Sequence, residues 1–141
     1  VASEVLSRAG EESDMIVGND EEFGFMAGGI DKGLNKARDL ASAGNRLVIY
    51  KMGEEGAITL YNNKEIKTGI FPTDAIKPVG AGDSFMAGLL SSLASGYDLK
   101  NSVIRGSACA SIVVSLPGCA PAMPDEDQLN NFINNSLIKD L

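Results

Sequence analysis

The segment Gly80-Ala81-Gly82-Asp83, followed by an apolar stretch with helical spacing, has the residue types best suited to chemistry in this sequence. Small residues at the first turn of a helix let backbone N–H groups approach a ligand closely, and those groups carry the positive end of the helix dipole. The segment therefore predicts an anion-binding turn. A carboxylate in such a turn opposes a bound anion, but it can act as a base toward a hydroxyl that attacks phosphorus. The alternative for Asp83 is a plain cap on a glycine-rich turn.

Two further segments combine turn residues with polar groups. Asn19-Asp20-Glu21-Glu22 follows the apolar run 14–18 and places a capping residue and three carboxylates where a helix should begin. Gly53 and Gly56 flank a tight turn after the apolar run 46–51. Both segments therefore follow a predicted strand directly.

The composition argues against several classes of function. Twelve Lys and Arg against nineteen Asp and Glu give a net charge of −7, which repels phosphate backbones, so we expect no nucleic-acid partner. No His and only two cysteines, Cys109 and Cys119, leave no Cys/His zinc site, and we expect two free thiols in a reducing compartment. No apolar run approaches the ~20 residues of a membrane span, and we expect no signal peptide. We therefore expect a cytoplasmic protein without a membrane partner.

Strands alternate with helices along the chain, which favours an α/β layer structure with a mainly parallel sheet. The length of 141 residues allows one compact domain. The expected strands are 14–18, 46–51, 57–61 and a returning segment 65–71. The expected helices are the end of a helix in 1–13, a stretch beginning at 19–22, and the segments 32–43, 84–95 and 99–115, with a last amphipathic helix carrying Leu129, Phe132 and Ile133.

Four motifs, in order along the chain, resemble those of the ribokinase-like (PfkB-type) sugar kinases. The matching segments are Asn19-x-x-Glu22, the Lys51–Gly56 turn, Gly80–Gly88 with Phe85, and Ala108–Ser115 with Gly118 and Pro124. The third matches the second half of the family signature Asp-Thr-x-Gly-Ala-Gly-Asp-x-Phe-x-x-Gly. The resemblance implies a three-layer α/β/α fold with a mainly parallel sheet. It also implies that residues 1–141 form a single partial domain, the C-terminal nucleotide-binding half, without the N-terminal sugar-binding half and its lid.

The resemblance implies roles for particular residues. Asp83 would be the catalytic base, and Gly80, Ala81 and Gly82 would offer amides to the transferred phosphoryl group of ATP. Asn19 and Glu22 would act on the nucleotide phosphates through Mg²⁺ and its waters, although a capping box explains the same pair. The implied nucleotide contacts are Lys51, Gly53, Gly56, Ser107, Ala108, Ser111 and Cys119. A plain hairpin glycine remains the alternative for Gly53, and a structural thiol for Cys119.

The chain departs from the family pattern at two places. Lys77-Pro78 stands where the family has Asp-Thr, and Ser107 stands where the adenine-side helix often carries Asn. In many relatives that Asp helps to hold a monovalent cation, and the ammonium group of Lys77 can supply the same positive charge. We therefore expect activity without a potassium requirement. The alternative is a solvated loop lysine.

Within the family, five segments are similar to the 5-dehydro-2-deoxygluconokinases of inositol catabolism. They are Lys51, Gly69–Pro72, Lys77, Ser111–Ser115 and Cys119–Pro124. The resemblance implies transfer of the γ-phosphoryl group of ATP to a sugar or sugar-acid hydroxyl, with 5-dehydro-2-deoxygluconate as the expected substrate. Kinases for 2-keto-3-deoxygluconate, fructose or ribose are alternatives.

A second class of function is a catalytically incomplete nucleotide-binding fragment. The absent N-terminal half would then be a separate chain or a cleaved segment, and the resemblance also allows a homodimer of the full-length protein. A dinucleotide-binding oxidoreductase is disfavoured, because no Gly-x-Gly-x-x-Gly follows the first strand.

Overall fold

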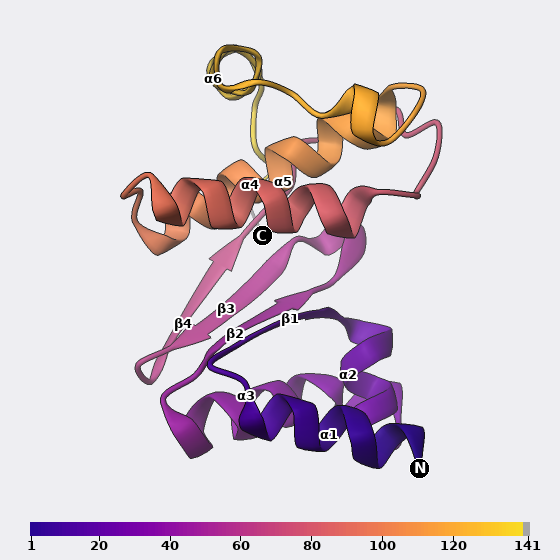
Figure 1. Ribbon diagram of the computed structural model, residues 1–141, viewed down its shortest axis with the longest axis vertical. Helices are drawn as coiled ribbons and strands as arrows, with labels where there is room; N and C mark the ends of the chain where they lie inside the picture. Colours follow the sequence, from indigo (N-terminus) through magenta and orange to yellow (C-terminus); the bar gives the residue numbers. More distant parts are fainter. Residues whose placement is uncertain (140–141) are drawn as a thin grey trace. The chain divides into compact units, whose positions relative to one another are not determined.

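The computed structural model describes residues 1–139, which divide into two compact units, Val1–Lys67 and a second unit that begins at Thr68 (Figure 1). The elements of the first unit are α1 (Ala2–Glu12), β1 (Met15–Asn19), α2 (Asp20–Ala27), the 3₁₀ turn Ile30–Lys32, α3 (Gly33–Gly44), β2 (Leu47–Lys51), the 3₁₀ turn Gly53–Glu55, β3 (Ala57–Tyr61) and β4 (Lys64–Thr68), whose last residue opens the second unit. Those of the second are α4 (Ala81–Ala94), α5 (Leu99–Ser115), the 3₁₀ turn Ala120–Ala122 and α6 (Glu126–Asn135). No helix in the described residues is both long and apolar enough to cross a bilayer.

The four strands form one mixed sheet in the order β1-β2-β3-β4. β1 and β2 are parallel, with Met15 opposite Leu47 and Asn19 opposite Lys51, whereas β2 and β3 are antiparallel. The prediction of a mainly parallel sheet therefore holds for the β1–β2 pair and is wrong for the β2–β3 pair. The physical reason is the length of the connections, because a parallel pair needs a crossover of a dozen or more residues and the turn at Gly53–Glu55 is far shorter.

Helices α1, α2 and α3 lie along one face of this sheet (Figure 1). Their apolar side chains form a buried core with that face, in which the rings of Phe23 and Tyr50 lie 5.5 Å apart. The buried members are Phe23, Ala37, Leu40, Val48, Tyr50, Ile58 and Leu60. This core fixes where β1 and β2 end, and therefore where the polar residues that follow them lie.

In the second unit, α4 and α5 form a hairpin of helices that approach each other at two glycines. A Cβ atom added to Gly88 would lie 2.8 Å from Cys109 Sγ and 2.9 Å from Gly106 Cα. One added to Gly106 would lie 2.8 Å from the carbonyl oxygen of Phe85. Backbone therefore packs against backbone at this crossing, with no room for a side chain.

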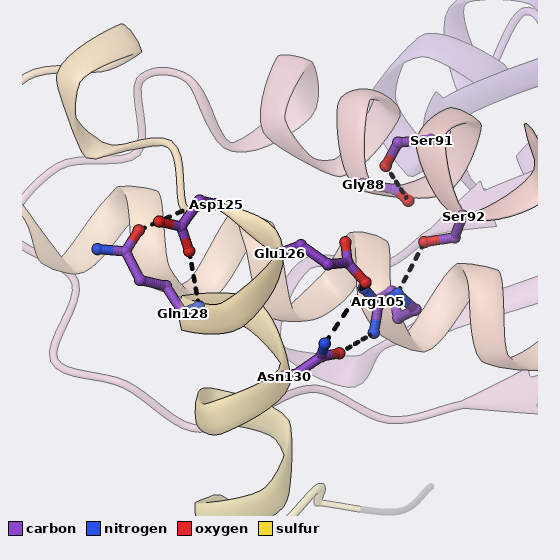
Figure 2. Close-up of polar contacts among 8 residues, drawn as sticks. All are labelled: Gly88, Ser91, Ser92, Arg105, Asp125, Glu126, Gln128 and Asn130. Atoms are coloured by element: carbon purple, nitrogen blue, oxygen red, sulfur yellow. Dashed lines mark hydrogen bonds and ion pairs between the residues drawn. The ribbon is translucent and has the colours of Figure 1, made fainter. Parts of the chain in front are cut away.

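The buried side chain of Arg105 on α5 joins α4 and α6 (Figure 2). Its Nε donates to Ser92 Oγ at 3.0 Å, Nη1 to Asn130 Oδ1 at 2.7 Å, and Nη2 to Glu126 Oε1 at 2.5 Å. The guanidinium also lies 4.4 Å above the ring of Tyr97. Arg105 therefore ties the three helices of the second unit together with directional contacts.

Candidate active site

The predicted anion-binding turn lies at the start of α4. Gly80 is the residue that precedes the helix, with φ 91° and ψ −6°, and the N–H of Ala81 donates to the carbonyl of Pro78 at 3.3 Å. These values match a type II turn over residues 78–81, in which the third position requires a positive φ and favours glycine. The helix begins at Ala81 rather than at the predicted residue 84.

Three N–H groups at the start of α4 are unpaired. No side chain caps this helix, and within residues 1–139 the N–H groups of Gly80, Gly82 and Asp83 donate no hydrogen bond. Asp83 lies in the first turn of α4 and is exposed, and its carboxylate has no hydrogen bond or ion pair within the described chain. The alternative of an aspartate cap is therefore wrong, and Asp83 presents a carboxylate beside unpaired amides.

The two cysteines lie in opposite environments. Cys119 is exposed, its Sγ lies 3.6 Å from the carbonyl oxygen of Val79, and a Cβ atom on Gly80 would lie 3.1 Å from it. Cys109 is buried, and this burial raises the pKa of its thiol to about 11. The prediction of two free thiols is confirmed.

Lys77 contacts the backbone beside the turn. Its Nζ donates to the carbonyl of Val113 near the end of α5 at 2.9 Å, and to the carbonyl of Val79 at 3.2 Å. The side chain is partly buried. The alternative of a solvated loop lysine is therefore wrong, because the ammonium group lies between two carbonyl oxygens.

The predicted nucleotide contacts on α5 are buried. The hydroxyl of Ser111 donates to the carbonyl of Phe71 at 2.9 Å, and Ala108 packs with Phe71 and Leu129 in the core of the second unit. Ser107 is 8% exposed. In this structure these side chains therefore hold α5 in place and present little surface to a ligand.

In the first unit, Asn19 and Glu22 form the capping box at the start of α2. The N–H of Asn19 donates to Glu22 Oε2 at 2.7 Å, and the N–H of Glu22 donates to Asn19 Oδ1 at 2.8 Å. A Cβ atom on Gly18 would lie 3.1 Å from Glu22 Oε2, so the glycine leaves room for the returning carboxylate. The box uses one oxygen of Glu22, and the other oxygen is left for a ligand.

The carboxyl ends of β1 and β2 bring these residues to one edge of the sheet. Asn19 is the register partner of Lys51, and the turn after Lys51 contains Gly53 at φ 56° and Gly56 at φ 88°. A Cβ atom on Gly53 would meet nothing within 4 Å, so this turn is open on its outer side. Ligands of α/β sheets bind outside the carboxyl ends of the strands, which makes this edge the expected ligand edge.

Two parts of the site carried no sequence signal. The carbonyl groups of Val79 and Val113 hold Lys77, but backbone atoms are present at every residue and leave no mark on composition. Gly18 makes room for the side chain of Glu22, but a glycine after a run of apolar residues is common and does not indicate such a role. The described residues contain no group of three or more His, Cys, Asp or Glu side chains that could hold a metal ion.

Comparison with known proteins gives a consistent result. The family model described as pfkB family carbohydrate kinase matches residues 2–126. The 5-dehydro-2-deoxygluconokinase of Geobacillus thermodenitrificans is 35% identical over 134 residues, which are 90% of this chain and 39% of that protein. The same-named protein of Photobacterium profundum is 39% identical over 127 residues, 86% of this chain and 38% of that protein. The chain thus spans about 39% of the length of these relatives.

Solved structures show the same fold. The ribokinase of Thermotoga maritima matches with a TM-score of 0.83 and 23% identity, over 92% of this chain and 45% of that one. The aminoimidazole riboside kinase of Salmonella enterica, solved with aminoimidazole riboside and an ATP analog, matches with a TM-score of 0.82 and 24% identity, over 95% and 46%. The predicted ribokinase-like α/β fold is therefore confirmed.

Proposed function

Because the chain belongs to the pfkB family of carbohydrate kinases, we propose that it carries the phosphoryl-transfer machinery of an ATP-dependent kinase that acts on a hydroxyl group of a sugar or sugar acid. One observation carries the proposal. The exposed carboxylate of Asp83 lies in the first turn of α4, beside the unpaired amides of Gly80 and Gly82. A base toward the attacking hydroxyl and donors to the phosphoryl oxygens are two of the groups that a protein supplies to in-line phosphoryl transfer.

The residues of the α4 turn have separate roles in this proposal. Asp83 accepts the proton of the substrate hydroxyl as its oxygen attacks the γ-phosphorus. The N–H groups of Gly80 and Gly82 donate to the phosphoryl oxygens, on which negative charge develops. Ala81 contributes its small size, because its own N–H already donates to Pro78 and closes the turn.

The nucleotide would lie against the carboxyl edge of the sheet in the first unit. Lys51, Gly53 and Gly56 offer a cation and an open backbone turn there, and Asn19 and Glu22 lie beside them through the Asn19–Lys51 register pair. Oxygen donors of this kind fit Mg²⁺, which usually keeps several waters and takes few protein ligands. When bound, Mg²⁺ would neutralise charge on the nucleotide phosphates. The ATP analog in the S. enterica kinase structure supports ATP as the donor.

In this proposal, most of the implied nucleotide contacts of the second unit hold α5 in place and do not touch the nucleotide. Ser107, Ala108 and Ser111 are buried and hold α5, whereas Cys119 is exposed and its side chain is accessible to a ligand. Their shared role is to fix the surface next to the α4 turn.

The names of the relatives support the substrate. Two proteins that are 35% and 39% identical to this chain are both named 5-dehydro-2-deoxygluconokinase. We therefore assign 5-dehydro-2-deoxygluconate as the substrate, with Asp83 acting on its hydroxyl group, and inositol catabolism as the process served.

Substitution of Asp83 by Asn tests the proposal. In the native protein that carries these residues, Asp83→Asn should lower kcat by about 10²- to 10⁴-fold, the usual contribution of a general base. The affinity for ATP should change little, because the amides and the sheet edge remain. Asp74→Asn, which neutralises an exposed loop carboxylate of the same unit, is the matched control and should leave kcat unchanged. Undiminished turnover in Asp83→Asn would remove this residue from the base role.

A nucleotide-binding role without turnover is the second candidate, and it is supported by the open turn at Gly53 next to the Asn19–Lys51 register pair, which contains no catalytic base. The two candidates differ in one measurement. A coupled ATP-turnover assay with 5-dehydro-2-deoxygluconate, 2-keto-3-deoxygluconate, fructose and ribose detects the kinase and identifies its substrate. Binding of ATP without turnover on any of these would favour the second candidate.

A further inference from the structure

We propose that Lys77 is a positioning residue that aims the amide of Gly80 at the transferred phosphoryl group. The proposal rests on the proposed function of the α4 turn and adds a residue that neither touches the substrate nor belongs to the turn. Three observations carry it: the carbonyl that Lys77 holds, the geometry of the peptide to which this carbonyl belongs, and the anchoring of Lys77 itself.

The carbonyl of Val79 and the N–H of Gly80 belong to one peptide group. A trans peptide is planar, so its C=O and N–H bonds point in opposite directions. Lys77 Nζ donates to the Val79 oxygen at 3.2 Å, and Cys119 Sγ lies 3.6 Å from the same oxygen. Holding this oxygen on one side therefore fixes the direction in which the Gly80 N–H points on the other.

This peptide is the one that is free to rotate in such a turn. Types I and II differ by a flip of the central peptide, and the positive φ of 91° at Gly80 marks the type II form. Glycine tolerates either sign of φ, so residue type alone does not select the form. The contact from Lys77 to the Val79 carbonyl favours the form in which this carbonyl faces the ammonium group.

Lys77 is itself anchored at both ends. Its backbone N–H lies 3.3 Å from the carbonyl of Val114, and the N–H of Ile76 donates to the same oxygen at 2.9 Å. Its Nζ donates to Val113 at 2.9 Å, so the side chain spans from α5 to the turn. The last carbonyls of a helix lack partners within the helix and carry the negative end of its dipole, which favours a cation there. The ammonium group is therefore held by α5 while it holds Val79.

A purely structural role predicts different behaviour from a positioning role. If Lys77 only capped α5, its loss would lower the stability of the fold and would leave the rate per folded molecule unchanged. If Lys77 positions the Gly80 amide, its loss lowers kcat in molecules that remain folded. A small cation placed against the two carbonyl groups should then restore the rate, since carbonyl oxygens can replace the hydration shell of a monovalent ion.

Three variants of the native protein separate these roles. Lys77→Met, which keeps the length and removes the charge, should lower kcat by about 10²-fold, the loss expected for one misplaced donor to a developing charge. Lys77→Ala vacates the position of the ammonium group, so ammonium or potassium chloride should restore most of its lost kcat, whereas neither salt should rescue Lys77→Met. Lys100→Met, at the exposed opposite end of α5, is the matched control and should keep the parental kcat.

Two results in this assay would overturn the proposal. One is an unchanged kcat in Lys77→Met. The other is a loss of kcat that no cation restores and that follows the fraction of unfolded protein, because this assigns Lys77 to capping of α5 alone.

A second readout needs no turnover and keeps the proposal separate from the kinase assignment. In the 141-residue chain, the amide resonance of Gly80 should move in Lys77→Met and should stay in place in Lys100→Met. An unmoved Gly80 resonance contradicts the positioning role even if the protein is an active kinase. A moved resonance supports it even if Asp83→Asn shows that the proposed base is wrong.

Discussion

Replacement of Arg105 by Met should destabilise the second unit by about 2 to 3 kcal/mol, because this one side chain joins α4, α5 and α6 (Figure 2). Methionine has nearly the same length and fills the same space without polar atoms. The substitution therefore removes the hydrogen bonds and the charge while it leaves little cavity behind.

The magnitude follows from the separate contacts. The hydrogen bonds from the guanidinium to Ser92 and Asn130 contribute about 1.5 kcal/mol each. The pair with Glu126 contributes less than about 1 kcal/mol, because the glutamate side chain is 63% exposed and solvent screens it. The ring of Tyr97 adds about 0.5 to 1 kcal/mol. Against this sum of about 4 to 5, burial of a guanidinium that is 7% exposed costs about 2 kcal/mol more than burial of methionine.

Urea unfolding followed by circular dichroism measures the free energy, and amide hydrogen exchange locates the effect. We expect faster exchange across α4, α5 and α6, since these helices share the lost contacts. Arg38→Met is the matched control, because Arg38 forms a bidentate pair with Glu65 at the surface and should cost less than about 1 kcal/mol. Equal losses in the two variants would refute the reasoning that burial makes the Arg105 contacts stronger.

Four further outcomes are expected. Replacing sodium by potassium should leave the turnover of the native protein unchanged, because Lys77 already places a positive charge between two carbonyl oxygens; a strong increase in rate contradicts this. A thiol reagent at pH 8 should label exposed Cys119 and spare Cys109, whose raised pKa of about 11 keeps it protonated. The raised pKa of Cys109 also makes stability depend on pH. The contribution of this thiol to the free energy of unfolding is complete below pH 9.0 and is lost as the pH rises toward 11, and unfolding measured across this range would show the loss. Gly80→Ala should lower stability by about 1 to 2 kcal/mol through its positive φ of 91°, and an unchanged unfolding midpoint would contradict the turn geometry.

Hydrophobic periodicity predicted most of the elements, because burial on one face leaves a regular trace in the sequence. The helix 99–115 and the strand 57–61 have the predicted bounds. The start of α4 was placed three residues late, since Ala81 and Gly82 carry no side chain that marks a helix terminus. The antiparallel pairing of β2 and β3 is set by the short turn that joins them. The prediction of a parallel sheet used the alternation of strands with helices and did not consider the length of this turn.

The residues of the candidate site were predictable where chemistry depends on side chains. Asp83, Asn19 and Glu22 are polar groups at helix starts, Asn19 partly buried and the other two exposed, and the sequence shows each of them. The hydrogen-bond partners of Lys77 are backbone oxygens, and the types of residues in the sequence do not indicate them. The sequence also did not indicate that Ser107 and Ser111 are buried, because small polar residues can face either solvent or a core.

The crossing of α4 and α5 at Gly88 and Gly106 restricts which mutations the chain can accept. Any β-carbon at either position would meet a neighbour at 2.8 Å, so every single-base change that replaces these glycines should be lost from a saturating mutational library under selection for folding. Sliding of one helix along the other would bring side chains into the same contact. We therefore expect relatives of this chain to keep small residues at both positions and to change their sequences elsewhere.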